Sequence, residues 1–152
     1  MLKLFDSHSR HLVDFQPADG KTALVYSCGP TVYDFAHIGN FRAFIFGDIL
    51  CRWLRYLGFE THQVMNLTDV DDKTIAGARR AGLPLREYTD QYTQAFFDDL
   101  ATLRVEPAWK YPRATEHIQQ MLDLVSTLLE KGHAYEVEGS VYFDISSFSG
   151  YG

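Results

Sequence analysis

The sequence CGPTVYDFAHIGN, residues 28–40, sets the architecture around which the rest of the chain is arranged. An apolar run at residues 23–26 leads into it, Gly29-Pro30 interrupts that run, and a long amphipathic pattern follows Gly39-Asn40. This order predicts a strand, a loop and the start of a helix. Backbone N–H groups and the positive end of a helix dipole meet at such a junction, which favours phosphate binding. A thiol and an imidazole in the same stretch add groups capable of chemistry.

The segments on both sides of residues 28–40 predict a strand, helix and strand in succession. Residues 21–27 form the first strand, whose continuous apolar run is typical of burial on both faces of a parallel sheet. Residues 60–67 form the second strand. Such units bring parallel strands together, and ligands bind at the carboxyl ends of those strands. We therefore expect Cys28 and Thr68 to open onto one crevice.

The helix between these strands ends at Gly58, and its apolar residues recur every four positions. This spacing predicts a buried stripe, with charged residues outside it and Cys51 as a small buried hydrophobe. The stripe consists of Ile45, Ile49, Leu50, Trp53, Leu54 and Leu57, and the charged residues outside it are Asp48, Arg52 and Arg55.

The remaining segments predict helices and two hairpins. We expect hairpin strands at residues 2–6 and 13–17, helices at 74–81, from Pro84 and at 115–132, and a second hairpin at 135–143. The helix from Pro84 carries Tyr88, Tyr92, Phe96 and Leu100 at helical spacing, which favours core packing over a base-stacking platform. Asp71 and Asp72 are interpreted mainly as helix-start residues and Asp69 as architectural. Their carboxylates could bind a divalent cation, but acidic residues at a helix start are too common to predict a site.

Length and composition favour one folded domain, with the start of a second as an alternative. The chain has 152 residues, of which 46% are hydrophobic. No apolar run approaches the ~18 residues of a membrane span, and the first residues lack the apolar region of a signal peptide, so we expect a cytoplasmic protein.

Two cysteines are too few for a disulfide framework. The net charge of −6 predicts weak or no binding of nucleic acid by this chain alone.

The stretch CGPTVYDFAHIGN resembles the segment of cysteinyl-tRNA synthetases that holds the first zinc ligand and the class I HIGH signature. His37-Ile38-Gly39-Asn40 stands in the place of that signature, with Asn in the fourth position. NLTDVDDK at residues 66–73 continues the resemblance at the spacing of the family. The resemblance covers nearly the whole chain but only the amino-terminal part of such an enzyme.

The fold implied by this resemblance is α/β. It is a Rossmann-like (HUP-type) parallel-sheet nucleotide-binding half, with following helices and the start of an inserted β segment. We expect residues 1–132 to form the N-terminal part of the catalytic domain and residues 133–152 to begin the connective insertion. The stop at Gly152 is interpreted as a truncation.

The activity implied by the resemblance is that of a cysteine–tRNA ligase, which activates cysteine with ATP to cysteinyl adenylate and transfers it to tRNA(Cys). The resemblance assigns Thr31, His37, Gly39 and Asn40 to ATP, with His37 and Asn40 as catalytic residues. It assigns Cys28, Gly29 and Thr68 to the amino acid, with Cys28 also a ligand of Zn²⁺. Mg²⁺ is expected to accompany ATP. The other zinc ligands and the KMSKS loop are expected outside this chain, so the fragment, expected to be a monomer, should not complete adenylation.

Two alternatives stay open at the level of sequence. One is the related ligase that joins cysteine to a glucosamine-inositol acceptor in mycothiol biosynthesis, because it shares the adenylation half. The other is a noncatalytic nucleotide-binding module that keeps the fold without the reaction.

Overall fold

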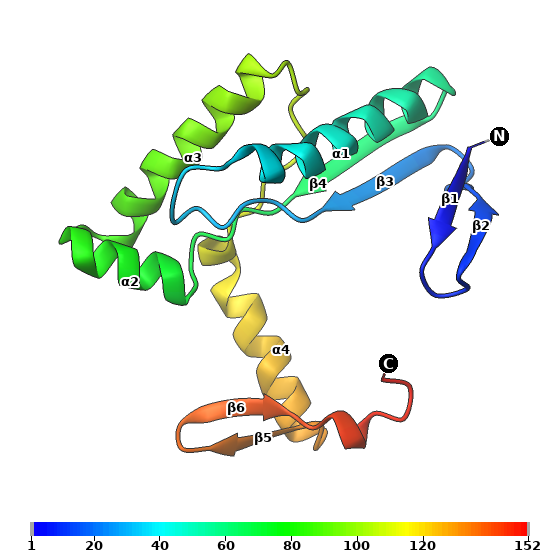
Figure 1. The fold of residues 1–152 in the computed structure, drawn as a ribbon. Coiled ribbons are helices and arrows are strands. Elements are labelled where there is room, and N and C mark those ends of the chain that lie inside the picture. Colours follow the sequence, from blue (N-terminus) through cyan, green and yellow to red (C-terminus); the bar gives the residue numbers. More distant parts are fainter. Residues whose placement is uncertain (1, 152) are drawn as a thin grey trace. The chain divides into compact units, whose positions relative to one another are not determined.

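The computed structural model describes residues 2–151 and divides into two compact units, one up to Arg113 and one from Ala114 (Figure 1). The boundary expected at residue 132 falls just after the last long helix, inside the second unit. The first unit contains β1 (Lys3–Asp6), β2 (His11–Asp14), β3 (Thr22–Ser27), α1 (Ile38–Tyr56), β4 (Glu60–Met65), α2 (Asp72–Ala81) and α3 (Leu85–Thr102). The second contains η1 (Ala114–His117), α4 (Ile118–Glu130), β5 (Ala134–Val137), β6 (Ser140–Phe143) and η2 (Ile145–Ser147).

The centre of the first unit is the expected strand–helix–strand arrangement. β3 pairs with β4 in parallel, in a register that runs from Thr22 opposite Glu60 to Ser27 opposite Met65. α1 connects the two strands and lies along them (Figure 1). The parallel sheet predicted from sequence is therefore confirmed, and its strands end next to each other.

Residues 110–113 add a third extended segment beside β4, at a place where the sequence pattern predicts no strand. Parallel bridges join Val64 to Lys110 and Leu67 to Arg113. The backbone N–H of Leu67 donates to the carbonyl of Pro112 at 2.8 Å. Pro112 has no backbone N–H to donate, but its carbonyl can still accept a hydrogen bond, so the segment can pair along β4.

The buried face of α1 differs from the predicted stripe. Phe41, Phe44, Gly47, Asp48, Cys51 and Leu54 are buried, whereas Ile49 is 59% exposed. Trp53 and Leu57 are exposed as well, and the prediction that Asp48 lies outside the buried face is wrong. The burial of Leu54 and Cys51, the partial burial of Ile45 and Leu50 and the exposure of Arg52 and Arg55 follow the prediction. Asp48 tolerates burial because its carboxylate accepts from the Nε of Arg52 at 2.8 Å and from the backbone of Glu106 at 3.0 Å.

The prediction that β3 is buried on both faces is wrong. Ala23 is fully buried, but Leu24 is 74% exposed and Tyr26 is also exposed. Exposure alternates along the strand because only the face that carries Ala23 is covered.

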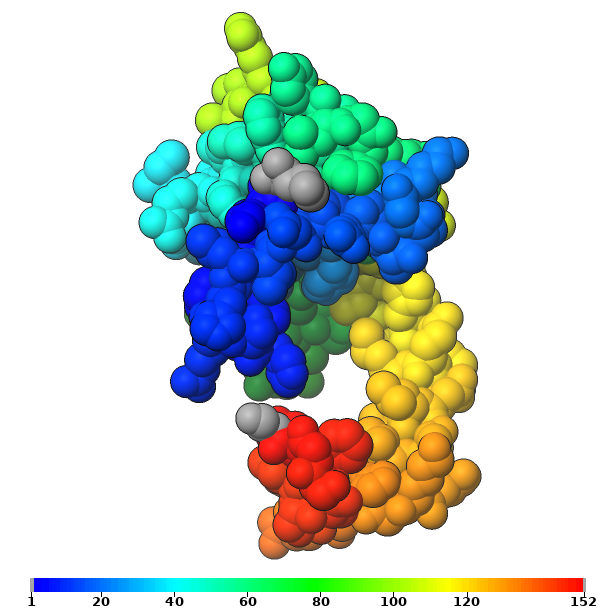
Figure 2. All heavy atoms as spheres, turned by 90° about the vertical axis from the view of Figure 1, so that its right-hand side faces the viewer, coloured from blue at the N-terminus to red at the C-terminus, as the bar shows by residue number. Residues whose placement is uncertain are grey.

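The hairpin of β1 and β2 is antiparallel, with Lys3 opposite Asp14 and Asp6 opposite His11. Its second strand therefore begins and ends a few residues earlier than expected. All four residues of β2 are exposed, and the hairpin, dark blue in Figure 2, lies at the surface of the first unit.

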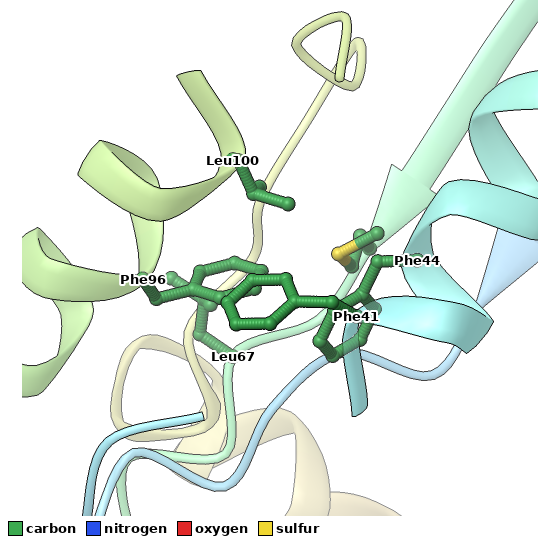
Figure 3. Close-up of a cluster of buried hydrophobic side chains, with 6 residues drawn as sticks. Phe41, Phe44, Leu67, Phe96 and Leu100 are labelled. Atoms are coloured by element: carbon green, nitrogen blue, oxygen red, sulfur yellow. The ribbon is translucent and has the colours of Figure 1, made fainter. Parts of the chain in front are cut away.

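The core of the first unit joins α1, β4 and α3. Phe41 and Phe44 from α1 meet Phe96 and Leu100 from α3, with Leu67 beside them (Figure 3). The rings of Phe44 and Phe96 lie 5.1 Å apart in an edge-to-face arrangement. Since Phe96 and Leu100 are almost fully buried, the aromatic stripe of α3 serves packing, as predicted.

In the second unit, β5 and β6 form the predicted antiparallel hairpin. Both turn residues, Glu138 and Gly139, have positive φ angles of 51° and 77°, as a type I′ turn requires. Within residues 2–151, no helix has both the length and the apolar composition that crossing a membrane requires.

Candidate functional site

Backbone hydrogen bonds join the loop after β3 to the chain that follows β4. Thr31 and Thr68 form a parallel bridge. The backbone N–H of Val32 donates to the carbonyl of Thr68 at 3.1 Å, and that of Thr68 donates to the carbonyl of Pro30 at 3.0 Å. The ends of the two strands are thus held together, with Thr31 and Thr68 as direct neighbours.

Asn66, which has no predicted role, fixes the position of this loop. Its Oδ1 accepts from the backbone N–H of Gly29 and from the hydroxyl of Tyr26, both at 3.0 Å. Its Nδ2 donates to the Oγ1 of Thr68 at 3.1 Å. A Cβ on Gly29 would lie only 1.8 Å from the carbonyl oxygen of Asn66. Gly29 is therefore required for the close approach of two backbones.

A hollow of about 340 Å³ lies between this loop and the start of α1. Of the predicted site residues, it brings together Gly29, Thr31, His37 and Asn40. The rest of its lining consists of Pro30, Tyr33, Asp34, Phe35, Ala36 and Phe44. Cys28, Gly39 and Thr68 lie outside this lining.

His37 and Asn40 cap the first turn of α1. The Nδ1 of His37 accepts from the backbone N–H of Gly39 at 3.1 Å, and the Oδ1 of Asn40 accepts from the backbone N–H of His37 at 3.0 Å. In the neutral imidazole, Nδ1 is then the acceptor and Nε2 carries the proton. Likewise, the amide nitrogen of Asn40 is the end left to donate. The cap therefore orients two N–H donors at the positive end of the α1 dipole.

Gly39 leaves room for this cap. A Cβ at residue 39 would lie 2.9 Å from the Cε1 of His37. The helix cap thus explains why residue 39 is a glycine. The predicted contact of Gly39 with a nucleotide stays a prediction.

Cys28 is exposed at the end of β3, and its thiol donates only a long hydrogen bond to the carbonyl of Gly29 at 3.6 Å. Among residues 2–151, no group of three or more His, Cys, Asp and Glu side chains could hold a metal ion. Catalytic zinc takes about three protein ligands. Residues 2–151 could therefore contribute one thiolate, that of Cys28, to a zinc site but could not form the site by themselves.

The wall of the hollow is supported by α2 and α3. The hydroxyl of Tyr88 donates to the carbonyl of Tyr33 at 2.7 Å, and the rings of Phe35 and Tyr92 meet at 5.2 Å. A Cβ on Gly77 would lie 2.3 Å from the Tyr88 hydroxyl, so only glycine at this position leaves room for the Tyr88 side chain. Asp71 caps α2 through Thr74, which confirms its helix-start role.

Arg113 ties α3 to the chain after β4. Its Nη1 lies 2.6 Å from the Oδ1 of Asp90 and 3.8 Å from the Oδ2 of Asp69, whose side chain is fully buried. Partial burial raises the pKa of Asp90, but the hydrogen bond and charge of Arg113, with the charge of Arg86, outweigh it and leave that pKa below its ordinary value.

The lowered pKa of Asp90 predicts a loss of stability in acid. Because its folded-state pKa lies below the unfolded value of about 3.9, the contribution is present above that value and is lost as the pH falls through the folded-state pKa. Between about pH 5 and pH 3, the wild-type chain should lose more free energy of unfolding than Asp90→Asn, by less than about 1 kcal/mol because the carboxylate is half exposed. Urea unfolding across this range measures the difference. Asp98→Asn, on the same helix, is the control, and equal acid sensitivity of wild type and Asp90→Asn would contradict the prediction.

Comparison with known proteins identifies the family. The sequence model of the family described as "tRNA synthetases class I (C) catalytic domain" matches residues 14–152. The chain belongs to this family. Among curated relatives of this class I synthetase chain, the cysteine–tRNA ligase of Brachyspira hyodysenteriae is 48% identical over 97% of the chain and 31% of the relative. That of Chlamydia muridarum is 50% identical over 99% of the chain and 32% of the relative.

The class I synthetase chain thus spans about a third of the length of these relatives. The cysteine–tRNA ligase of Methanosarcina mazei, 45% identical over 100% of the chain, shows the same share, 32%. Among solved structures, the methionyl-tRNA synthetase of Mycobacterium tuberculosis in complex with methionyl-adenylate matches with a TM-score of 0.66 and 15% identity. This match covers 81% of the chain and 29% of that structure, and it confirms the predicted Rossmann-like α/β fold.

Proposed function

We propose that the chain forms the amino-terminal part of the catalytic domain of a cytoplasmic, monomeric cysteine–tRNA ligase. The observation that carries this proposal is the identity of 45–50% with curated cysteine–tRNA ligases over nearly the whole chain. It favours this function over mycothiol biosynthesis and over a noncatalytic module. The complete protein would form cysteinyl adenylate from cysteine and ATP and transfer the cysteine to tRNA(Cys).

In the adenylation step, the carboxylate of cysteine attacks the α-phosphate of ATP and pyrophosphate leaves, with Mg²⁺ accompanying the nucleotide. Negative charge builds on the phosphoryl oxygens, so the rate depends on donors aimed at them in advance. The Nε2–H of His37 and the amide of Asn40 supply such donors, and the α1 dipole adds to them. Asn40 gives a hydrogen bond without the positive charge that a protonated histidine would bring. Thr31 and Gly39 flank the nucleotide in this proposal.

The amino-acid side of the site comprises Cys28, Gly29 and Thr68. A zinc ion would bind a thiolate in preference to a hydroxyl and so separate cysteine from serine, a discrimination that pocket fit alone supplies poorly. Cys28 provides one protein ligand for this ion. Gly29 and Thr68, both held by Asn66, keep the position of Cys28 fixed relative to the second strand end. The other ligands and the KMSKS loop would come from the part of the relatives that this chain does not span.

The activity test is cysteine-dependent exchange of pyrophosphate into ATP, followed by cysteinylation of tRNA(Cys). The complete protein that carries this chain should do both, whereas the chain of 152 residues should do neither at enzymatic rates. Exchange that depends on another amino acid would refute the proposed function.

Cys28→Ala in the complete protein should remove most of the bound zinc and lower the cysteine-dependent exchange. The reason is that the zinc loses one of about three protein ligands. Metal analysis and exchange assays measure both effects. Cys51→Ala is the matched control, because its thiol is buried within α1. Full zinc content in Cys28→Ala would show that Cys28 is not a ligand.

A further inference from the structure

A second hollow, also of about 340 Å³, lies beside α2 and is not used by the adenylation chemistry. It is lined by Tyr33, Asp72, Lys73, Ala76 and Arg80. The Nζ of Lys73 lies 4.8 Å from the centre of the Tyr33 ring, so the ammonium group makes a cation–π contact with one face of this exposed side chain.

Tyr33 connects this hollow to the candidate site, because it lines both of them. Its backbone is fixed there by the hydrogen bond from the Tyr88 hydroxyl. A flexible ligand that leaves the site past Tyr33 therefore meets Lys73 first and Arg80 further along α2.

The charge of this surface differs from that of the chain. The whole chain carries −6, whereas the two cations and one carboxylate of the hollow give a net charge of +1. Lys73 and Arg80 are seven residues apart on one helix, which places them about 10 Å apart along its axis, far enough for two separate phosphates. Cations along a path with an exposed ring are typical of single-stranded nucleic-acid binding.

We propose that this second hollow is a groove that guides the single-stranded 3′ end of the RNA acceptor to the candidate site. Lys73 and Arg80 bind its backbone phosphates, and Tyr33 lies against one of its bases. This assignment rests on the proposed function, since it requires that the acceptor be an RNA. It adds a path for the acceptor that the adenylation chemistry does not define.

The test uses the complete protein and a fluorescent RNA oligonucleotide with the sequence of a tRNA 3′ end. Lys73→Ala and Arg80→Ala should each weaken its binding by roughly fivefold and lower the slope of log affinity against log salt by about 1. Asp72→Asn should strengthen binding, because it removes the carboxylate from the lining. Arg79→Ala, on the same helix but outside the lining, is the control. Pyrophosphate exchange in the four variants should stay within about twofold of wild type, since none of the four substituted side chains lines the adenylation hollow.

The outcomes separate this proposal from the proposed function. Weaker binding and a lower salt slope in Lys73→Ala and Arg80→Ala, but not in Arg79→Ala, support the groove even if the wild-type protein shows no cysteine-dependent exchange, which would refute the proposed function only. Unchanged binding in both variants overturns the groove. An equal loss in Arg79→Ala also overturns it, because the effect would then reflect the general charge of α2.

Discussion

Replacing Gly29 with alanine is expected to lower the free energy of unfolding by about 3 kcal/mol. The added Cβ would lie 1.8 Å from the backbone oxygen of Asn66 and 2.9 Å from the Cγ of Met65. A backbone oxygen cannot rotate away as a side chain can, so the loop after β3 must separate from the end of β4. The same shift breaks the hydrogen bond from Gly29 to Asn66. Urea unfolding of the chain measures the loss.

Gly47→Ala is the matched control for this substitution. Its Cβ would lie 3.1 Å from the Nε2 of Gln63, a side-chain amide that donates to the Oγ of Ser27 and needs to shift by only a few tenths of an ångström. Alanine also favours the interior of a helix by about 1 kcal/mol over glycine. We expect Gly47→Ala to be neutral or stabilising. A cost below about 1 kcal/mol for Gly29→Ala would show that the two backbones can separate without strain.

Replacing His37 with asparagine is expected to lower the rate of cysteine-dependent pyrophosphate exchange by about 100-fold in the complete protein. Asparagine is a good helix N-cap, so the first turn of α1 keeps an acceptor for the Gly39 N–H. The substitution removes the imidazole Nε2–H, the proposed donor to the phosphate. Exchange kinetics and urea unfolding on the same samples separate the two roles.

His37→Ala is the companion variant, because it removes the cap and the donor together. It should lose activity as His37→Asn does, and lose about 1 kcal/mol of stability in addition. If His37→Asn keeps wild-type exchange rates, the histidine serves α1 alone, and the assignment of a catalytic role to it is wrong.

The parts of the fold that sequence could predict are those set by local patterns. The strand before Cys28, the helix that ends before Gly58 and the turn at Glu138-Gly139 each follow from periodicity or turn chemistry, and all are present. The buried face of α1 did not follow, because its apolar residues encircle much of the helix and the partner decides which are covered. Phe41 and Phe44 are buried because α3 brings Phe96 to them from 52 residues further along the chain than Phe44.

The residues of the candidate site that belong to a sequence motif could be predicted. Those whose role depends on tertiary contacts could not. Thr31, His37 and Asn40 were identified from the signature and its surroundings, and they share one hollow. Asn66 stood at the start of the second motif, but its role depends on the parallel pairing of β3 and β4, which places its amide against Gly29. The reciprocal cap of His37 and Asn40 also needed coordinates, because histidine is not a typical capping residue.

The three hydrogen bonds of Asn66 have a consequence for how this region can change shape. A single amide group joins Tyr26, Gly29 and Thr68, which belong to two chain segments about 40 residues apart. Any displacement of the loop toward or away from a ligand must therefore carry the Thr68 end with it. The loop after β3 and the chain after β4 are therefore coupled, so closure around a substrate would have to come from the elements that face them.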